Sequence, residues 1–190
     1  MRTQSPTSSR VAMPTILTRR ILRDGLVLAA VFTLFVLGSF LIEPALWLQD
    51  YPPDVIAAVQ PPPDVSQALR IAVAVIASFG LGFLFVRSAL GYRHDVPEPR
   101  YLGVLLHVFL LFLLVNVWDL VVLDWLFFVT IQPDLVVFPG TEGLAGYRDY
   151  WFHFRASFLH PTPWIAGVVL SLGAGTIAWW LGRRMWANSS

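Results

Sequence analysis

The sequence predicts an all-α integral membrane protein, a four-helix transmembrane bundle with both termini in the cytoplasm and a structured outer cap. Three observations lead to this class. Of 190 residues, 56% are hydrophobic and only 13% are charged, whereas soluble domains average about 25% charged residues. The apolar residues are clustered into four runs of bilayer length. The arginines alternate between the segments that separate these runs, as the positive-inside rule requires.

The first apolar run, Gly25 to Ile42, holds 18 residues without a charge and predicts a span over about 24–43. A helix that crosses about 30 Å of hydrocarbon needs roughly 20 residues, so the run is long enough. A cleaved signal peptide is the competing interpretation, because arginines precede the run. We prefer an uncleaved anchor, since a signal peptide has an apolar region of about 7–15 residues and a small-residue cleavage site. The polar residues 1–18 are predicted to form a disordered cytoplasmic tail.

Three further runs predict spans over about 67–90, 101–131 and 163–182. Arg70 and Arg87 lie near the ends of the second run, where their long side chains can reach the membrane surface. The third run is about 46 Å long as a helix, which exceeds the hydrocarbon thickness. We therefore expect a long tilted helix that emerges from the membrane and ends before Pro133. A kink followed by an interfacial run, or a re-entrant segment, is the alternative for residues 120–132.

The positions of the arginines predict the orientation. All 13 basic residues are arginine, and ten of them lie in the N-terminal tail, the link between the second and third spans, and the C-terminus. These segments are therefore expected in the cytoplasm, with loops 43–66 and 132–162 on the outer side. The prediction is one transmembrane domain over 19–184 and a cytoplasmic C-terminus over 185–190, in the inner or plasma membrane of the cell.

The outer loops are predicted to form the structured cap. Six aromatic residues occur within twelve positions of the second loop, namely Tyr147, Tyr150, Trp151, Phe152, Phe154 and Phe158. Such density beside a span is typical of an amphipathic segment that lies at the membrane interface.

Polar side chains interrupt the third span. Asn116 and Asp119 are three residues apart and share a helix face, and Asp124 follows them. Because ionisable groups are costly in lipid, such residues by default mark a polar path, a partner residue or a ligand site. The alternative is that both aspartates lie at the outer interface, where water reaches them. His107, nearer the inner side, is predicted to donate a hydrogen bond to another helix.

A second set of candidate site residues lies in the aromatic segment. Four residues have the spacing of one helical stripe, namely Asp149, His153, Ala156 and His160, and Arg155 lies on the neighbouring stripe. They either converge on a polar substrate or divalent metal, or form the hydrated face of an amphipathic helix, which we favour. The spacing matches no established metal signature, so no metal and no cofactor is predicted. The candidates for metal ligands are Asp149, His153 and His160, which Asp119 or Asp124 could join.

Two stripes of small residues predict close helix packing. Each repeats every four residues, as Ala74, Ser78 and Gly82 in the second span and as Gly167, Ser171 and Gly175 in the fourth. Small side chains let helix backbones approach each other in lipid. We expect these faces to pack within the bundle or against another subunit.

The residue types and motifs that the sequence lacks exclude several functions. Without cysteine, the chain cannot form a disulfide, a thiolate nucleophile or a cysteine-bound zinc site. It has no dinucleotide-binding, Walker A or HExxH pattern. It also lacks the basic face of a nucleic-acid-binding protein.

The function favoured by elimination is that of an accessory, assembly or interaction subunit of a larger membrane complex. Its partners would be the lipid bilayer and either another membrane protein or a second copy of the chain, and we lean against an enzyme. Two alternatives stay open. One is a transporter-like or ligand-binding bundle whose polar site is formed by Asn116, Asp119 and Asp124. The other is a membrane enzyme that acts at the outer surface through Asp149, His153, Arg155 and His160.

Overall fold

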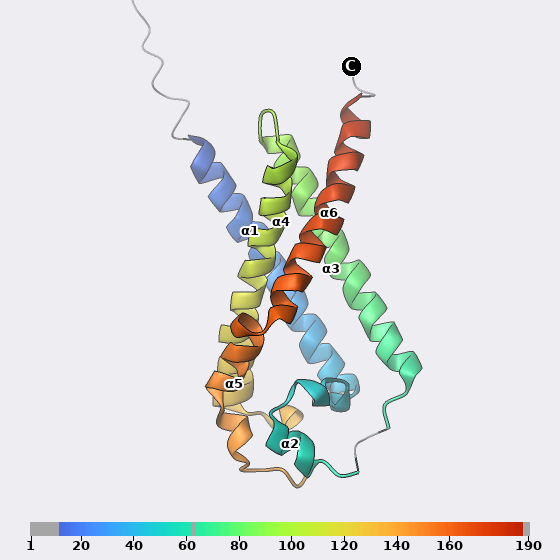
Figure 1. Cartoon of the computed structure of the whole chain (residues 1–190), viewed down its shortest axis with the longest axis vertical. Coiled ribbons are helices and arrows are strands. Elements are labelled where there is room, and N and C mark those ends of the chain that lie inside the picture. Colours follow the sequence, from blue (N-terminus) through green and yellow to red (C-terminus); the bar gives the residue numbers. More distant parts are fainter. Residues whose placement is uncertain (1–11, 62–63, 188–190) are drawn as a thin grey trace, which may run out of the picture.

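A computed structural model of the chain describes residues 12–61 and 64–187, which are helical apart from short connections (Figure 1). Four helices are long and apolar enough to cross a membrane. They are α1 (Ala12–Ile42), α3 (Gln67–Asp95), α4 (Tyr101–Trp118) with its continuation η2 (Asp119–Ile131), and α6 (Pro161–Ala187). No strand occurs in the described part of the chain. The predicted all-α class with four helices of membrane-spanning length is therefore confirmed.

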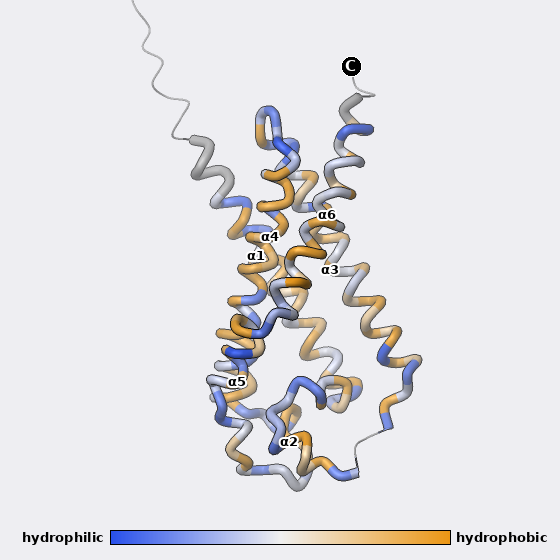
Figure 2. The backbone as a smooth tube through the Cα atoms, in the orientation of Figure 1, coloured by the Kyte–Doolittle hydropathy of each residue, from blue (hydrophilic) through white to orange (hydrophobic). Residues whose placement is uncertain are grey.

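The bundle has two ends that differ in character (Figure 1). α1 begins and α6 ends at the same end, which also holds the link between α3 and α4 and which we call the terminal end. The segments 43–61 and 132–160 lie together at the opposite end, which we call the loop end. Hydrophobic residues concentrate in the middle of the helices, and hydrophilic residues are frequent at both ends (Figure 2). This distribution is what a bilayer around the bundle requires.

The N-terminal prediction needs a correction. α1 begins at Ala12, so the predicted disordered tail over 1–18 is wrong for residues 12–18. A helix that is already nucleated extends at little cost, because each added residue contributes one more backbone hydrogen bond. Residues 1–11, which make up the rest of that predicted tail, and residues 188–190 of the predicted C-terminus lie outside the described residues.

α4 is the central helix of the bundle and packs against α1, α3 and α6. Its buried residues Val104, Val108 and Leu111 repeat at helical spacing and belong to the main apolar core. Leu28 of α1 and Ala178 of α6 contact the same core. Since lipid is as apolar as these side chains, van der Waals packing and interhelical hydrogen bonds hold such helices together.

The two stripes of small residues occupy different surroundings. In α6, Ser171 is buried, and a Cβ atom at Gly167 would lie 2.6 Å from the Phe112 ring of α4. Gly175 packs equally closely on Leu105 of the same helix. In α3, by contrast, Ala74 and Ser78 are exposed, and nothing lies within 4 Å of a Cβ atom at Gly82. The half of α3 nearest the loop end diverges from the other helices (Figure 1).

The third span is continuously helical over 31 residues, Tyr101–Ile131. From Asp119 onward the winding is π-helical, so that hydrogen bonds join residues five apart instead of four. Gln132 then adopts a left-handed conformation with φ of 48°, and its amide donates to the carbonyl of Phe127. This residue and Pro133 after it end the helix.

We predict that Gly167→Val destabilises the bundle by about 1–3 kcal/mol, because the added methyl groups force α4 and α6 apart. Thermal unfolding in detergent, followed by circular dichroism, measures the change. Gly173→Val is the matched control, since it makes the same substitution in α6 where nothing lies within 4 Å of the new Cβ atom. Equal effects of the two substitutions would contradict the close packing of α4 and α6 at Gly167.

Candidate functional site

A cavity of about 280 Å³ lies at the loop end. Its walls come from α1, from α4 with η2, from the start of α6, and from η1 (Pro44–Asp50) in the first loop. The second loop contributes four short helices: η3 (Asp134–Val136), η4 (Ala145–Arg148), α5 (Tyr150–Phe154) and η5 (Arg155–Leu159). Seven aromatic residues line it, namely Phe32, Phe40, Trp47, Tyr51, Phe128, Tyr147 and Phe152. Its ionisable lining residues are Asp50, Asp119, Asp124, Tyr51, Tyr147 and His153. The cavity therefore combines several aromatic rings with three carboxyl groups.

The three polar residues predicted in the third span all line this cavity. Asn116, Asp119 and Asp124 belong to the lining, and His153 joins them from α5. In a regular α-helix, Asp119 and Asp124 would be about 140° apart around the axis, because each residue turns the helix by about 100°. In π winding, hydrogen bonds join residues five apart, and residues i and i+5 lie close to the same side of the helix. The π-helical winding of η2 thus places both carboxylates on the same side.

An ion pair and a hydrogen bond connect the second loop to the third span. Nδ1 of His153 lies 3.2 Å from Oδ1 of Asp124, and both side chains are largely buried. The Asn116 side-chain amide donates to the carbonyl of Ser157 at 3.2 Å. Asp119 makes no hydrogen bond with the described residues, so its carboxylate is left available to a bound molecule.

Asp50 is a site residue that the sequence analysis missed. It ends η1 and faces the cavity from the first loop. Burial, which removes water from the carboxylate, raises the pKa of Asp50 above its ordinary value. Repulsion from the carboxylate of Asp124 raises it further. Nothing in the sequence distinguishes Asp50 from the other acidic residues of that loop, because its role depends on a contact with a segment about seventy residues away.

Hydrogen bonds between the two loops hold the cavity wall in place. The carboxylate of Asp54, in α2 (Pro53–Ala58), accepts from the amide of Gly146 at 2.8 Å. The Tyr51 hydroxyl donates to the carbonyl of Val136 at 2.8 Å, and burial raises the pKa of Tyr51, so it stays a neutral donor. The Tyr147 hydroxyl accepts from the amide of Phe138 at 3.0 Å. These contacts join segments from both loops around one small apolar core.

Trp47 fixes η1 against α1. Its indole nitrogen donates to the hydroxyl of Ser39 at 2.8 Å, and its ring stacks on Phe40 with centroids 5.8 Å apart. Asp50 follows three residues after Trp47, at the end of the same short helix. The position of the Asp50 carboxylate is therefore set by an aromatic contact and a hydrogen bond to a spanning helix.

The stripe predicted for the aromatic segment is not formed. The side chain of Asp149 caps α5 and accepts from the amide of Phe152 at 2.8 Å. The winding changes from α to π at Arg155, and the helix ends before His160, whose backbone is extended. Arg155 and His160 are exposed. Both the cap and the change of winding break the α-helical spacing on which the stripe was based, and of its ionisable residues only His153 lines the cavity.

The three residues named for a possible metal are likewise not brought together. Asp149 is committed to its helix cap, and Nδ1 of His160 accepts a hydrogen bond from the amide of Thr162 at 3.3 Å. Within residues 12–61 and 64–187, no three His, Cys, Asp or Glu side chains are grouped so as to hold a metal ion. The arrangement at the loop end is that of a binding cavity with separate carboxylates.

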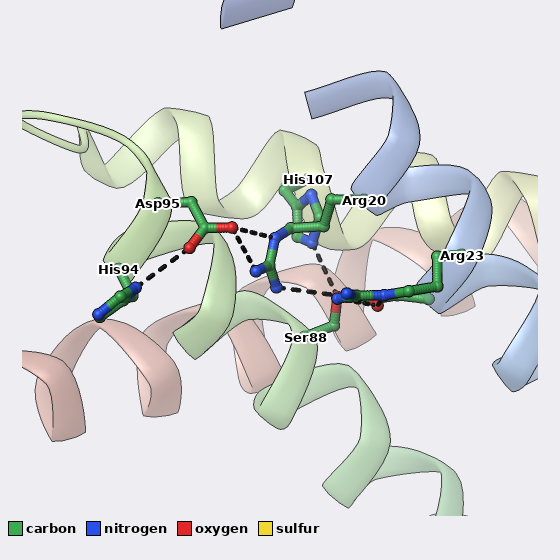
Figure 3. A network of polar contacts seen from close by, with 7 residues as sticks. Arg20, Arg23, Ser88, His94, Asp95 and His107 are labelled. Atoms are coloured by element: carbon green, nitrogen blue, oxygen red, sulfur yellow. Dashed lines mark hydrogen bonds and ion pairs between the residues drawn. The ribbon is translucent and has the colours of Figure 1, made fainter. Parts of the chain in front are cut away.

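A second polar cluster lies at the terminal end, where α1, α3 and α4 meet (Figure 3). The hydroxyl of Ser88 donates to Asp24 at 2.7 Å and lies 3.0 Å from Nε2 of His107. Because the single hydroxyl proton is used on Asp24, Nε2 of His107 is the donor in the second contact. The predicted hydrogen bond from His107 to another helix is thus confirmed. Nδ1 of His107 is buried and has no hydrogen-bond partner among the described residues.

Comparison with known proteins adds no functional assignment. No protein family model, no curated protein and no solved structure matches the chain. In the cavity at the loop end, three carboxyl groups lie together with seven aromatic rings.

Proposed function

We propose that this chain is a transporter-like or ligand-binding membrane bundle whose cavity at the loop end binds a small organic cation. The observation that carries the proposal is the convergence of Asp50, Asp119 and Asp124 on one cavity. His153 is the one basic side chain among the described lining residues, and it already pairs with Asp124. The excess of carboxyl groups over basic side chains favours a positively charged guest, which would compensate the carboxylates on binding.

The aromatic wall supports an organic cation over a bare metal ion. Aromatic faces attract cations within about 6 Å of the ring centre, and rings such as Trp47 and Tyr51 supply such faces. A metal ion would need several oxygen ligands close together, whereas the carboxylates come from η1 and from two successive turns of η2. A volume of about 280 Å³ suits a molecule of a few carbon atoms.

The packed core supports binding rather than an open channel. Leu28, Val108 and Leu111 are almost fully buried and lie between the cavity and the polar cluster at the terminal end. A molecule in the cavity would meet these side chains on its way through the bundle. Transport would therefore require the helices to repack, whereas binding requires no change.

We further propose that the loop end faces the outside of the cell and the terminal end the cytoplasm. Arginines support this orientation, because eight of those in the described chain lie at or near the terminal end, namely Arg19, Arg20, Arg23, Arg87, Arg93, Arg100, Arg183 and Arg184. The chain has no native cysteine, so a single Gln49→Cys variant tests the orientation. An impermeant thiol reagent added to intact cells should label it, and failure to label would reverse the assignment.

Choline should bind the purified protein, and Asp119→Asn should weaken this binding by about tenfold or more, because a charged hydrogen-bonding or ion-pairing partner is lost. Isothermal titration calorimetry in detergent measures the affinity. Asp134→Asn is the control, since Asp134 is an exposed carboxylate of the second loop that does not line the cavity. The neutral isostere 3,3-dimethylbutan-1-ol should bind much more weakly. Equal binding of the two compounds would contradict a cation site.

The affinity for choline should fall as the pH is lowered. Protonation removes the negative charge of the carboxylates, and the raised pKa of Asp50 makes this loss begin at a higher pH than the ordinary value of 3.8 would give. In the Asp50→Asn variant, the decline in choline affinity should shift to lower pH. This variant lacks the carboxylate of Asp50 and therefore also its repulsion of Asp124. Titrations at several pH values check this, and an affinity that rises on acidification would contradict the electrostatic basis of the site.

An accessory or assembly role stays a second proposal. The specific feature that favours it is the exposed stripe of α3, where Ala74 and Ser78 face away from the bundle. Native mass spectrometry of protein extracted in mild detergent tests this role. A stoichiometric membrane-protein partner or a homodimer supports it, and a monomer without partner contradicts it.

A further inference from the structure

A second cavity, of about 500 Å³, lies at the terminal end between α1 and α3, far from the proposed cation site. Three arginines line it: Arg20 and Arg23 from α1 and Arg87 from α3. Its charge is thus opposite to that of the cavity at the loop end. The residues around it determine how much of that positive charge is available to a ligand.

Arg20 is held in place by the protein itself. Its guanidinium group pairs with Asp95 of α3 and lies 3.5 Å from Asp24 (Figure 3). Gly91 is needed for this arrangement, because a Cβ atom there would collide with the Arg20 guanidinium group. Arg20 is therefore a positioning residue that joins α1 to α3 and forms the rigid back of the cavity.

The two other arginines keep hydrogen-bonding capacity. Arg23 pairs with Asp24 at 2.8 Å, yet 67% of its side chain is exposed, and a guanidinium group carries five N–H donors. Arg87 is exposed and makes no ion pair or hydrogen bond within the described part of the chain. Because the three arginines face only two carboxylates, Asp24 and Asp95, one positive charge stays uncompensated.

The cavity is charged at one side and apolar at the other. Val27 and Leu84 line it together with the arginines. α1 runs away from the terminal end and α3 runs toward it (Figure 1), so these two residues lie deeper in the bundle than Arg23 and Arg87. Val27 is 47% exposed, which leaves apolar surface open to a guest. An inorganic anion would contact only the charged half of the cavity. A phospholipid would contact both halves, because its phosphate group and acyl chain follow each other in the same order as the arginines and the apolar residues.

We propose that this cavity binds the phosphate group of an anionic phospholipid, with Arg23 and Arg87 on the phosphate and the acyl chain against Val27 and Leu84. Basic pockets between spanning helices are suited to anionic headgroups, and guanidinium groups bind phosphate oxygens in pairs. Ser88 and Asp24 beside them fix the floor of the site through their 2.7 Å hydrogen bond. The lipid would join α1 to α3 where their own contact is polar.

The test compares phosphatidylglycerol binding to three forms of the full chain by native mass spectrometry. The site variant carries Arg23→Gln and Arg87→Gln. The control variant carries Arg148→Gln and Arg155→Gln, which remove the same charge from two exposed arginines at the loop end. We expect binding to fall about tenfold or more in the site variant and to stay unchanged in the control. Equal losses in both variants, or none in the site variant, would overturn the proposal.

Two further variants separate a folding defect from a loss of lipid binding, and lipid binding from phosphate binding. Should the double variant fail to fold, Arg87→Gln alone serves, because Arg87 has no partner in the described chain whose loss would disturb the fold. Val27→Gln should weaken the binding of phosphatidylglycerol without changing the affinity for inorganic phosphate. If inorganic phosphate displaces the lipid at an equal concentration, the apolar half contributes nothing and the lipid assignment is wrong.

Discussion

The winding of one helix decides where the polar groups of this protein meet. α4 packs against the three other spanning helices, and its continuation η2 changes from α to π winding at Asp119. That change brings the carboxylates of Asp119 and Asp124 to the same side of the helix, where like charges repel. π-helical turns are rare and are frequently found at functional sites. The π-helical segment and the acidic cavity coincide in this chain.

The charges of the bundle are sorted by end. Carboxylates line the cavity at the loop end, and arginines line the cavity at the terminal end. Between them lies an apolar core that includes Val108 and Leu111. An ionisable group within a membrane costs several kcal/mol, so such groups persist only where a partner or a ligand compensates them. Within the bundle, Arg20 and Asp95 compensate each other, whereas Asp119 has no such partner among the described residues.

The loop end owes its order to contacts between segments far apart in the chain. Asp54 binds the amide of Gly146, and Tyr51 binds the carbonyl of Val136. Together the two loops bury Val55, Phe138 and Tyr147 in one small core. A cavity built from two loops and three long helices can change shape when either loop moves, which suits a site that admits and releases a guest.

The sequence by itself determined the all-α class and the four helices of membrane-spanning length, because the length of an apolar run is a local property and bilayer thickness sets the required length. It also pointed to Asn116, Asp119 and Asp124, since charge within such a run is conspicuous. Only the tertiary structure decided that Asp50 and His153 join them, and that Asp149 is a helix cap. These outcomes depend on the winding of η2 and on contacts between segments far apart in the chain. The spacing of residues within one segment predicts neither.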